Sequence, residues 1–424
     1  MGSLKDMYRK VIEEHFPPTI TISFGDKVLT YTKKMWNING EIKGLRYGDN
    51  PDQPAALYEF TSGELTIGDT VWRTSGGIIS SLTDAELIQS GKHPGKTNLT
   101  DIDNGCNILQ YLASRPAAVI LKHNNPCGVA WSKKNIGNAL EKAFWCDRIA
   151  AFGGAIVVNR PLDHDSAKLI SKHYFEVIAA PDYEPGVLEL LTTKKNLRIL
   201  KLPGLSSLDQ LTYSHYLDIK SLCDGGLILQ ESFLNRVRST TSFLPATAIS
   251  KDGITISAKQ PTDEQIEDLL FAWSVEAGVS SNSVIFAHDG ATVAIGTGEQ
   301  DRVGCIELAI FKAYAKYADK LTYQNYGLSL YELREQAAND KCSLEKLEQI
   351  KKETNEVCGG LKGSVMVSDG FFPFRDSVDL CINQGVTAIA QPGGSLNDYD
   401  VIKTANESSP QIAMVFTGQR SFKH

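Results

Sequence analysis

Lysine and histidine stand side by side at the end of a short apolar run, and this pair could carry out acid–base chemistry. Residues 117–121 are all apolar, and Lys122 and His123 follow them directly. A five-residue apolar run between Pro116 and a proline–glycine turn over residues 125–128 predicts a buried strand of a parallel or mixed sheet. The carboxyl ends of strands border the ligand crevice in open α/β folds. An imidazole there could act as a base near neutral pH, and an ammonium could stabilise a developing oxyanion. The alternative is a surface lysine beside a structural histidine.

A loop late in the chain is dense in aromatic rings. Phe371, Phe372 and Phe374 follow Ser368-Asp369 and surround Pro373. Three phenylalanines within four positions are costly if they are merely exposed. We expect them either to line an apolar slot for a flat ligand or to fill a core.

Other residues could contact a ligand, although each also has a simpler structural interpretation. Arg46 and Tyr47 lie in a turn-rich loop, where binding groups are often placed, but these residues alone favour a plain turn with a solvated arginine. Asn98 could cap a helix or point into a site. Glycines 153 and 154 precede an apolar strand and would allow close approach of a ligand or of another backbone. Glu176 enters the strand over 177–180 and could simply be exposed.

The elements that must position these residues alternate along the chain. After a short charged helix to about residue 15 and a hairpin over 19–31, helices over 138–146 and 165–174 alternate with short apolar strands. This alternation predicts an α/β domain. A polar connection indicates a domain change near residues 200–225. Beyond it we expect a helix over 265–277 and a hairpin around Asp289-Gly290, because Asp-Gly between two apolar runs is a strong hairpin signal.

Composition excludes several classes. The chain has 424 residues, of which 42% are hydrophobic and 22% are charged, with a formal net charge of -7. This acidic balance argues against nucleic acid as a partner, although a local cluster of arginines could still hold a small anion. The eight cysteines are scattered without zinc-site spacing and are typical of reduced thiols. We find no secretory leader and no membrane span in the sequence. We therefore expect a soluble, cytoplasmic protein.

Taken together, these pieces occur in a specific order. The motifs are Leu45-Arg46-Tyr47-Gly48, Asn50-Pro51, Lys122-His123, Asn125-Pro126-Cys127-Gly128, Phe152-Gly153-Gly154, Ser281-Asn282, Gly298 to Arg302, Ser368-Asp369, Phe371 to Asp376, and the terminal Arg420, Phe422 and His424. From about residue 40 to 424 the chain resembles the transformylase domain of the 5-aminoimidazole-4-carboxamide ribonucleotide (AICAR) formyltransferase/IMP cyclohydrolase family. The cyclohydrolase domain is absent, so the resemblance implies a stand-alone transformylase.

The resemblance implies transfer of a formyl group from 10-formyltetrahydrofolate to the 5-amino group of AICAR in purine biosynthesis. His123 would take the proton from the attacking amine, while Lys122 and Asn282 would stabilise the oxyanion. The ribonucleotide would be held by Arg46, Tyr47, Asn98, Gly153, Glu176, Arg420 and Phe422. The reduced folate would be received by Ile149, Arg302, Val303, Phe371, Pro373, Phe374 and Asp376. A structural potassium ion is implied near Val279, Ser281, Ser283 and Asp369.

The resemblance also implies the fold and the assembly. We expect an α/β fold of two cytidine-deaminase-like three-layer subdomains with mixed sheets, in a homodimer whose active sites use both chains. The expected division is an N-terminal helix and hairpin segment over 1–40, a first subdomain over 41–222 and a second over 223–424. Zinc is not expected, because Ala130 stands where zinc deaminases that share Pro126-Cys127 carry a second cysteine.

One departure from the family pattern leaves other functions open. The loop that usually reads Asn-Pro-His-Gln has Asp52 in place of the histidine, which puts an anion beside the expected nucleotide. Two alternatives follow: a formyltransferase with another substrate or formyl donor, and a catalytically weak AICAR-binding protein.

Overall fold

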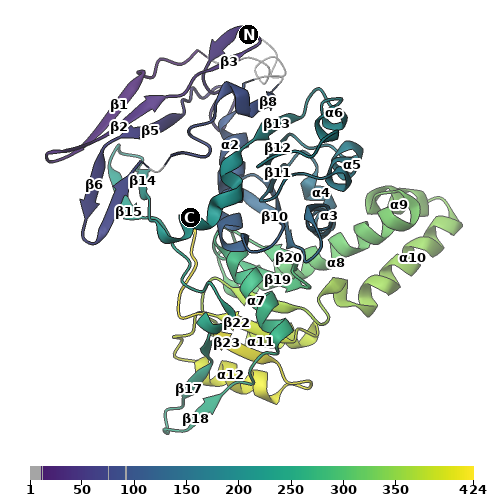
Figure 1. Ribbon diagram of the computed structural model, residues 1–424. Coiled ribbons are helices and arrows are strands. Elements are labelled where there is room, and N and C mark those ends of the chain that lie inside the picture. Colours follow the sequence, from purple (N-terminus) through teal and green to yellow (C-terminus); the bar gives the residue numbers. More distant parts are fainter. Residues whose placement is uncertain (1–10, 12, 75, 91–92) are drawn as a thin grey trace. The chain divides into compact units, whose positions relative to one another are not determined.

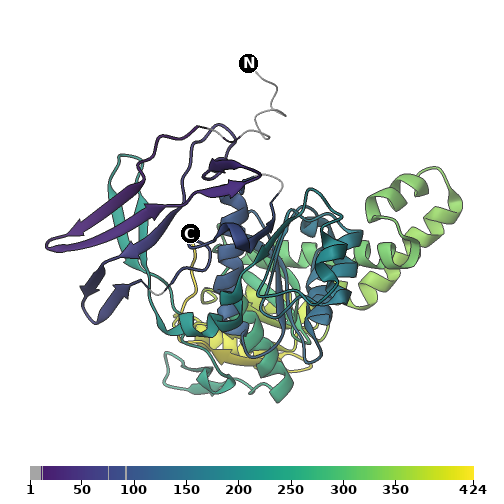
Figure 2. The ribbon, with the colours of Figure 1, turned by 45° about the horizontal axis from the view of Figure 1, so that its top comes forward.

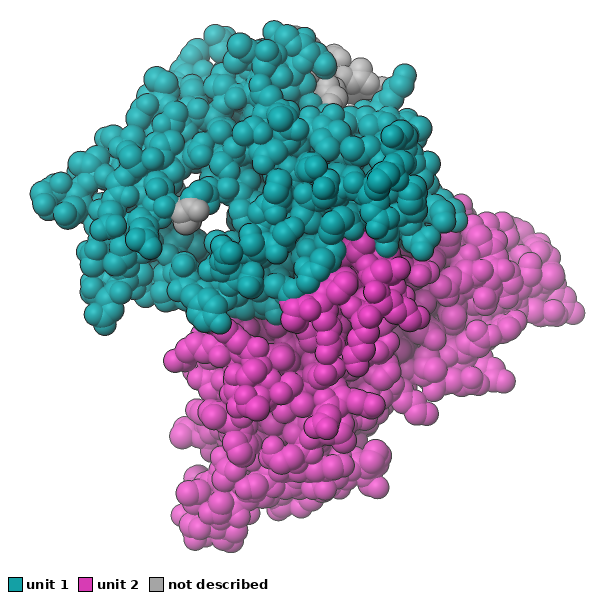
Figure 3. Space-filling view, viewed as in Figure 1, with its two compact units in different colours: residues 1–113, 121–124, 153–234 teal, residues 114–120, 125–152, 235–424 magenta. Residues whose placement is uncertain are grey.

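The computed structural model describes the chain except for residues 1–10, 12, 75 and 91–92. It divides into two compact units, coloured separately in Figure 3: unit 1 holds 1–113, 121–124 and 153–234, and unit 2 holds 114–120, 125–152 and 235–424. These units interleave along the chain, whereas the sequence predicts contiguous subdomains. The expected N-terminal helix lies largely outside the described residues, and residues 13–17 are not helical.

Unit 1 contains a mixed sheet with the strand order β11-β12-β13-β8 (Figure 1). Strands β11 (Ala155–Val158), β12 (Val177–Ala180) and β13 (Arg198–Lys201) are parallel, and β8 (Leu87–Gln89) is an antiparallel edge. Helix α2 (Lys96–Leu109) packs on β11 so closely that a Cβ on Gly105 would overlap the Val157 side chain. The remaining helices are α5 (His164–Lys172) and α6 (Val187–Leu191), with 3-10 turns η1 (Asp84–Glu86), η2 (Gln110–Leu112) and η3 (Pro203–Tyr213).

Short antiparallel strands form a second layer of structure within unit 1. A three-stranded sheet joins β1 (Thr19–Phe24), β2 (Lys27–Lys33) and β5 (Tyr58–Ser62), which confirms the predicted N-terminal hairpin. Three further hairpins pair β3 (Trp36–Ile38) with β4 (Glu41–Lys43), β6 (Glu64–Ile67) with β7 (Thr70–Arg73), and β14 (Leu217–Ser221) with β15 (Leu227–Glu231). Leu29, Leu65 and Trp72 form a small separate core.

Unit 2 is built on mixed-sheet strands in the order β16-β23-β22-β21-β19-β20-β10-β9. Its strands are β9 (Ala117–Lys122, whose last two residues are counted in unit 1), β10 (Asn125–Trp131), β16 (Leu244–Pro245), β19 (Val284–His288), β20 (Ala291–Gly296), β21 (Val365–Ser368), β22 (Ala388–Gln391) and β23 (Ala413–Phe416), beside the separate hairpin of β17 (Thr247–Ile249) and β18 (Thr255–Ser257). Strands β21, β22 and β23 are parallel, and the neighbouring pairs are antiparallel. A continuous core includes Phe286, Phe372 and Met414.

The helices of unit 2 are α3 (Ile136–Cys146), α4 (Arg148–Ala151), α7 (Asp263–Glu276), α8 (Arg302–Tyr326), α9 (Leu330–Ala337), α10 (Lys341–Glu356), α11 (Asp376–Asn383) and α12 (Asp398–Glu407), with 3-10 turns η4 (Thr240–Ser242) and η5 (Cys358–Gly360). The helix predicted over 265–277 is confirmed as α7, but it begins two residues earlier, where Thr262 and Gln265 form a capping box. Helix α8 ends at Gly327, whose φ of 71° suits glycine. Helices α9 and α10 extend from the end of α8 as a pair in both ribbon views (Figures 1 and 2), around Leu333 and Ile350.

The same order of elements occurs twice. A helix (α2 or α7) precedes a β-hairpin (β9–β10 or β19–β20), and three parallel strands with an antiparallel edge strand complete the set. The expectation of an α/β fold with mixed sheets is confirmed, as is the hairpin predicted at Asp289-Gly290. Likeness to cytidine deaminases stays a prediction. Among the described residues, no helix is long and apolar enough to cross a membrane.

Candidate active site

Lys122 is the last residue of β9, and a two-residue turn of His123 and Asn124 joins this strand to β10. The prediction that the Lys-His pair ends a buried strand is confirmed. His123 has a φ of 55° and Asn124 a φ of 60°. Positive φ at both central residues is the requirement of a type I′ turn. The segment 125–128, which the sequence predicts as a turn, is instead the start of β10, because asparagine tolerates the left-handed region and closes the turn earlier.

Helix α2 holds this turn through two polar side chains. The backbone N–H of Asn124 donates to Asp101 Oδ1 at 2.6 Å, and Asn104 Nδ2 donates to the Asn124 carbonyl at 2.8 Å. Burial raises the pKa of Asp101, while the Asn124 N–H and the nearby His123 act to lower it. The imidazole of His123 therefore lies within electrostatic reach of the Asp101 carboxylate, on a turn that is hydrogen-bonded to α2.

The equivalent hairpin in unit 2 uses the same device. Asp268, the sixth residue of α7 as Asp101 is of α2, accepts from the backbone N–H groups of Asp289 at 2.9 Å and Gly290 at 2.7 Å. Both turn residues there also have positive φ. Holding a type I′ turn is therefore a structural role of this aspartate, shared by both hairpins.

Arg46 and Tyr47 are buried in the loop after β4, where only 8% of Arg46 is exposed. The Arg46 N–H donates to the Pro94 carbonyl at 2.9 Å, and the Lys96 N–H donates to the Tyr47 carbonyl at 3.1 Å, so the loop is tied to the start of α2. Arg46 Nη2 donates to the Tyr47 hydroxyl at 2.9 Å. The alternative of a solvated arginine on a plain turn is wrong.

Asn98 lies in the first turn of α2, where it connects two parts of unit 1. The helix begins at Lys96 with Gly95 as its N-cap residue, so Asn98 is not itself the cap. Its Oδ1 accepts from the Gly95 N–H at 3.4 Å, and its Nδ2 donates to Glu176 Oε2 at 3.3 Å. The Asn98 side chain therefore accepts a hydrogen bond at the helix start and also donates one to Glu176, another candidate site residue.

Gly153, Glu176 and Arg198 lie at the amino ends of three adjacent parallel strands. The Gly153 N–H donates to the Tyr174 carbonyl at 2.9 Å, and the Arg198 N–H donates to the Glu176 carbonyl at 3.0 Å. The φ of Gly153 is 74°, and a Cβ there would contact the Tyr174 ring. Sequence reasoning missed Arg198, although a cation opening an otherwise apolar strand was a usable signal.

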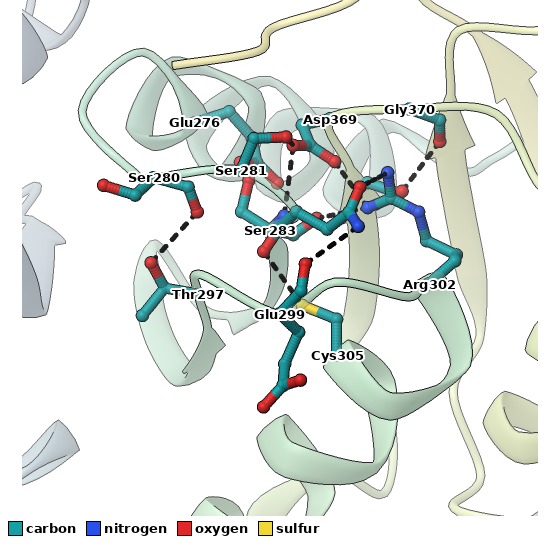
Figure 4. A network of polar contacts seen from close by, with 12 residues as sticks. Glu276, Ser280, Ser281, Ser283, Thr297, Glu299, Arg302, Cys305, Asp369 and Gly370 are labelled. Carbon is teal, nitrogen blue, oxygen red and sulfur yellow. Dashed lines mark hydrogen bonds and ion pairs between the residues drawn. The ribbon is translucent and has the colours of Figure 1, made fainter. Parts of the chain in front are cut away.

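Unit 2 assembles a second group of candidate residues around Arg302, the first residue of α8 (Figure 4). Arg302 is 8% exposed. Its Nη1 donates to the Ser283 carbonyl at 3.0 Å and pairs with Asp369 Oδ1, and its Nη2 donates to Asn282 Oδ1 at 2.8 Å. The guanidinium therefore fixes the side chain of Asn282.

The Asn282 carboxamide is oriented from both ends. Its Oδ1 accepts from Arg302, so its Nδ2 is the group that donates to the Glu299 carbonyl at 2.9 Å. The Asn282 backbone N–H donates to the same carbonyl at 3.1 Å. A carboxamide nitrogen carries two hydrogens, and this contact uses one of them.

The residues expected to hold potassium form a buried oxygen-rich network (Figure 4). Ser281 Oγ donates to Asp369 Oδ2 at 2.5 Å, and the Ser283 N–H donates to the same oxygen at 3.1 Å. Ser283 Oγ donates to Oε2 of Glu276, a buried residue that sequence reasoning missed. Burial, together with the nearby Asp369, raises the pKa of Glu276 well above its usual value. Val279 is buried, and its N–H donates to the Glu276 carbonyl at 3.1 Å.

This donor set is chemically suited to a hard cation of low charge. Hydroxyl and carboxylate oxygens are the ligands that such ions prefer. Glu276 Oε1 is buried without a hydrogen-bond partner, which leaves one acceptor of the network unsatisfied. Among the described residues, no group of three or more His, Cys, Asp or Glu side chains could hold a metal ion.

The aromatic loop divides between core and surface. Phe372 is fully buried in the core of unit 2, whereas Phe374 is 62% exposed and Phe371 is intermediate. The Arg420 guanidinium lies 5.0 Å from the centre of the Phe371 ring and 5.6 Å from that of Phe422. The core interpretation is therefore confirmed for Phe372, and a slot for a flat ligand stays a prediction.

The remaining expected folate residues also lie in unit 2. Asp376 starts α11, Val303 follows Arg302 in α8, and Ile149 is 49% exposed on α4. Pro373 accepts a hydrogen bond at its carbonyl from Asn397 Nδ2 at 2.7 Å. A cavity of about 410 Å³ lies beside the loop, lined by Phe374, Arg375, Asn397, Asp400, Lys403, Thr404 and Glu407.

Each unit thus gathers its own share of the expected residues. Unit 1 holds Lys122, His123, Arg46, Tyr47, Asn98, Gly153 and Glu176. Unit 2 holds Asn282, Ile149, Arg302, Val303, Phe371, Pro373, Phe374, Asp376, Arg420, Phe422 and the expected potassium residues.

Comparison with known proteins gives one consistent result. A family profile described as "AICARFT/IMPCHase bienzyme" matches residues 7–312. Proteins named bifunctional purine biosynthesis protein PurH are similar to this chain: that of Caldicellulosiruptor saccharolyticus is 34% identical over 90% of the chain and 59% of its own length. Those of Aquifex aeolicus and Magnetococcus marinus are 32% and 34% identical, over 98% and 96% of the chain and 65% and 62% of their own lengths. The chain therefore spans about three fifths of the length of these relatives.

Proposed function

Because this chain belongs to the AICARFT/IMPCHase bienzyme family, we propose that it is a formyltransferase of purine biosynthesis. It transfers the formyl group of 10-formyltetrahydrofolate to the 5-amino group of AICAR and releases formyl-AICAR and tetrahydrofolate. The observation that carries this proposal is the turn of Lys122 and His123, held by Asp101 and Asn104 of α2 within the part of the chain that the family profile matches.

The chemistry needs a base and an oxyanion donor. The 5-amino group is conjugated to the imidazole carboxamide and is a poor nucleophile. His123 accepts its proton as the nitrogen attacks the formyl carbon. Lys122 and Asn282 Nδ2 stabilise the negative charge that develops on the formyl oxygen. Collapse of the tetrahedral intermediate breaks the bond to the folate nitrogen, which leaves with a proton as tetrahydrofolate.

Substrate contacts follow the two groups of residues. The ribonucleotide is assigned to Arg46, Tyr47, Asn98, Gly153, Glu176, Arg420 and Phe422. The reduced folate is assigned to Ile149, Arg302, Val303, Phe371, Pro373, Phe374 and Asp376. The exposed ring of Phe374 supports this assignment, because an aromatic face open to solvent is a suitable wall for a flat pterin.

A structural potassium ion is part of the proposal. Ser281, Ser283 and Asp369, with the region of Val279, would hold it, and the unsatisfied Oε1 of Glu276 supports a cation nearby. When bound, the ion would neutralise buried carboxylate charge in the network that orients Asn282. The chain's own residues perform the chemical step.

The assembly is proposed to be a homodimer whose active sites use both chains. Three consecutive apolar side chains of β15 support a protein partner, since Leu227, Ile228 and Leu229 are 62%, 47% and 45% exposed. Contiguous exposed apolar surface is typical of interfaces.

Steady-state kinetics test the function. Purified protein with AICAR and 10-formyltetrahydrofolate should produce tetrahydrofolate and formyl-AICAR in equal amounts. Tight binding of AICAR without product would instead favour a nucleotide-binding protein of weak activity. Turnover only with another aminoimidazole nucleotide or another donor would favour the altered-substrate function, which Asp52 suggests. Asp52 is exposed in its loop, where a substrate could contact it.

A further inference from the structure

Arg198 is a buried cation that makes no ion pair with any residue that the structure describes. It opens β13, and only 8% of it is exposed. The described residues provide its side chain with no ion pair and no hydrogen bond, and its Nε is buried without an acceptor. Burying an unpaired charge is costly, so a guanidinium in this position calls for an anion.

Arg46 is a second guanidinium of the same kind in unit 1. Its Nε is also buried without an acceptor, and its one described side-chain hydrogen bond goes to the neutral Tyr47 hydroxyl. Contacts through Glu176 and Asn98 connect the two arginines. The Arg198 N–H donates to the Glu176 carbonyl at 3.0 Å, Asn98 Nδ2 donates to Glu176 Oε2 at 3.3 Å, and the N–H of Gly95, which borders Arg46, donates to Asn98 Oδ1 at 3.4 Å. Burial and then the nearby Arg46 act to lower the pKa of Arg198. Two like charges in a buried site repel each other, and an anionic ligand between them would offset this repulsion.

The carboxylate nearby cannot balance both cations. Glu176 acts to raise the pKa of Arg198, so it lies within electrostatic reach, but its described side-chain partner is Asn98. One carboxylate offsets one guanidinium at most. An excess of one positive charge remains, in addition to the partial positive charge at the start of α2.

Gly95 borders Arg46 and places no side chain against its guanidinium. A Cβ on Gly95 would lie 3.7 Å from Arg46 Nη2 and 3.6 Å from the Tyr47 ring. Guanidinium forks match phosphate oxygens in geometry, and a phosphate monoester brings nearly two negative charges near neutral pH.

We propose that Arg198 and Arg46 together bind the phosphate monoester of the substrate, which makes Arg198 a binding and specificity residue that distinguishes the ribonucleotide from its unphosphorylated riboside. The proposal rests on the proposed function for the identity of the nucleotide. The phosphate subsite itself depends only on the two arginines.

The test compares a ligand with and without its phosphate. Dissociation constants of AICAR and of its riboside are measured by calorimetry for the wild type, for Arg198→Met and for Arg160→Met. Arg160 is the control, because its guanidinium already donates to the carbonyls of Asn159 at 2.9 Å and Ala113 at 2.8 Å. In Arg198→Met the preference for AICAR over the riboside should fall by roughly 10- to 100-fold, while riboside binding stays unchanged. In Arg160→Met the preference should be that of the wild type.

An unchanged preference in a folded Arg198→Met variant would overturn the proposal. If that variant does not fold, Arg198→Lys replaces it. A preference for AICAR within twofold of the wild type in Arg198→Lys also counts against the proposal, because lysine lacks the bidentate fork.

Inorganic phosphate separates the proposed phosphate subsite from the proposed formyltransferase function. If AICAR does not bind, but phosphate raises the melting temperature of the wild type and not of the Arg198 variant, the phosphate subsite stands and the proposed function fails.

Discussion

His123 is the residue on which the proposed chemistry depends, and its backbone is as informative as its ring. A histidine with positive φ is uncommon, and such conformations concentrate at functional sites. The tight turn presents Lys122 and His123 together, because no further loop residue separates the end of β9 from the turn. Because Asp289 in the equivalent turn also has a positive φ, this conformation comes from the turn type, and the functional interpretation of the Lys-His pair stays a prediction.

Replacing His123 with alanine should lower kcat by about 10²- to 10⁴-fold, because the attacking amine loses its general base. The matched control is His288→Ala, which removes an exposed histidine beside the equivalent turn of unit 2. Steady-state rates of both variants check the prediction. Equal rates for His123→Ala and the wild type would remove His123 from the mechanism.

Asp398 gives a pH-dependent prediction at the residue scale. Burial raises its pKa above the usual value, against the lowering effect of the Gly394 and Ser395 N–H groups and of the Gln391 side chain. A raised folded-state pKa means that the folded protein keeps a proton that the unfolded chain has released. The resulting stabilisation is complete below the unfolded pKa and is lost as pH rises through the folded pKa.

The wild type should therefore lose stability relative to Asp398→Asn as pH increases from about 4 to 6. The loss is about 1.4 kcal/mol for a tenfold difference between the acid dissociation constants of the folded and unfolded states. Urea unfolding of both proteins across that range measures the difference. A difference in unfolding free energy that is independent of pH would show that Asp398 is ionised equally in both states.

At the scale of elements, the arrangement of a helix and a hairpin occurs twice, so one copy can serve as a structural control for the other. Asp101 and Asp268 each hold a type I′ turn from the sixth residue of a helix. Only the first of these turns carries the Lys-His pair. Positioning and stability can therefore be measured separately in one chain.

Asp101→Ala and Asp268→Ala should each destabilise the protein by about 1–3 kcal/mol, because backbone N–H groups of the turn lose a charged acceptor. Only Asp101→Ala should also lower kcat, with little change in KM for either substrate, because the imidazole is no longer held in place. Denaturant titration and steady-state kinetics of both variants provide the test. A similar fall of kcat in Asp268→Ala would mean that the effect is general destabilisation.

Gly128 shows how tightly β10 packs against α3. A Cβ at this position would overlap the carbonyl oxygen of Ala143, which is backbone and cannot rotate away. Gly128→Ala should cost about 1–3 kcal/mol or more by overpacking. Gly44→Ala is the control, because a Cβ there meets only ordinary contacts at 3.5 Å. A melting temperature of Gly128→Ala equal to that of the control would contradict this packing.

Features with a local sequence signal could be predicted from the sequence, whereas features that depend on burial in the folded chain could not. Apolar runs, Asp-Gly and capping residues identified β9, the β19–β20 hairpin and α7. The turn at His123-Asn124 was missed because Pro126 and Gly128 are stronger turn residues than the two that form it. Glu276 was not identified because its importance comes from the lack of a partner for Oε1 in the folded chain, which no local pattern reveals. Arg198 had a local signal, as a cation that opens an apolar strand, but its burial without an acceptor for Nε is visible only in the structure.

At the scale of the whole molecule, the candidate residues belong to two units, and the proposed homodimer with shared sites has a direct consequence. His123→Ala and Asn282→Ala each remove one catalytic group, from unit 1 and unit 2 respectively. If these groups come from different chains, a mixed dimer contains one intact site. Subunits mixed in equal amounts should then recover about a quarter of wild-type activity. No recovery, with mixed dimers shown to form, would place both groups of each site in one chain.

The most direct test of the central claim follows the formyl group itself. Wild-type protein in excess over AICAR is mixed with 10-formyltetrahydrofolate that carries ¹³C in its formyl carbon, and the nucleotide is examined by NMR. The account predicts that the label appears on the 5-amino nitrogen of the nucleotide in a single turnover, with tetrahydrofolate as the other product. Label that stays on the folate while AICAR is fully bound would contradict it.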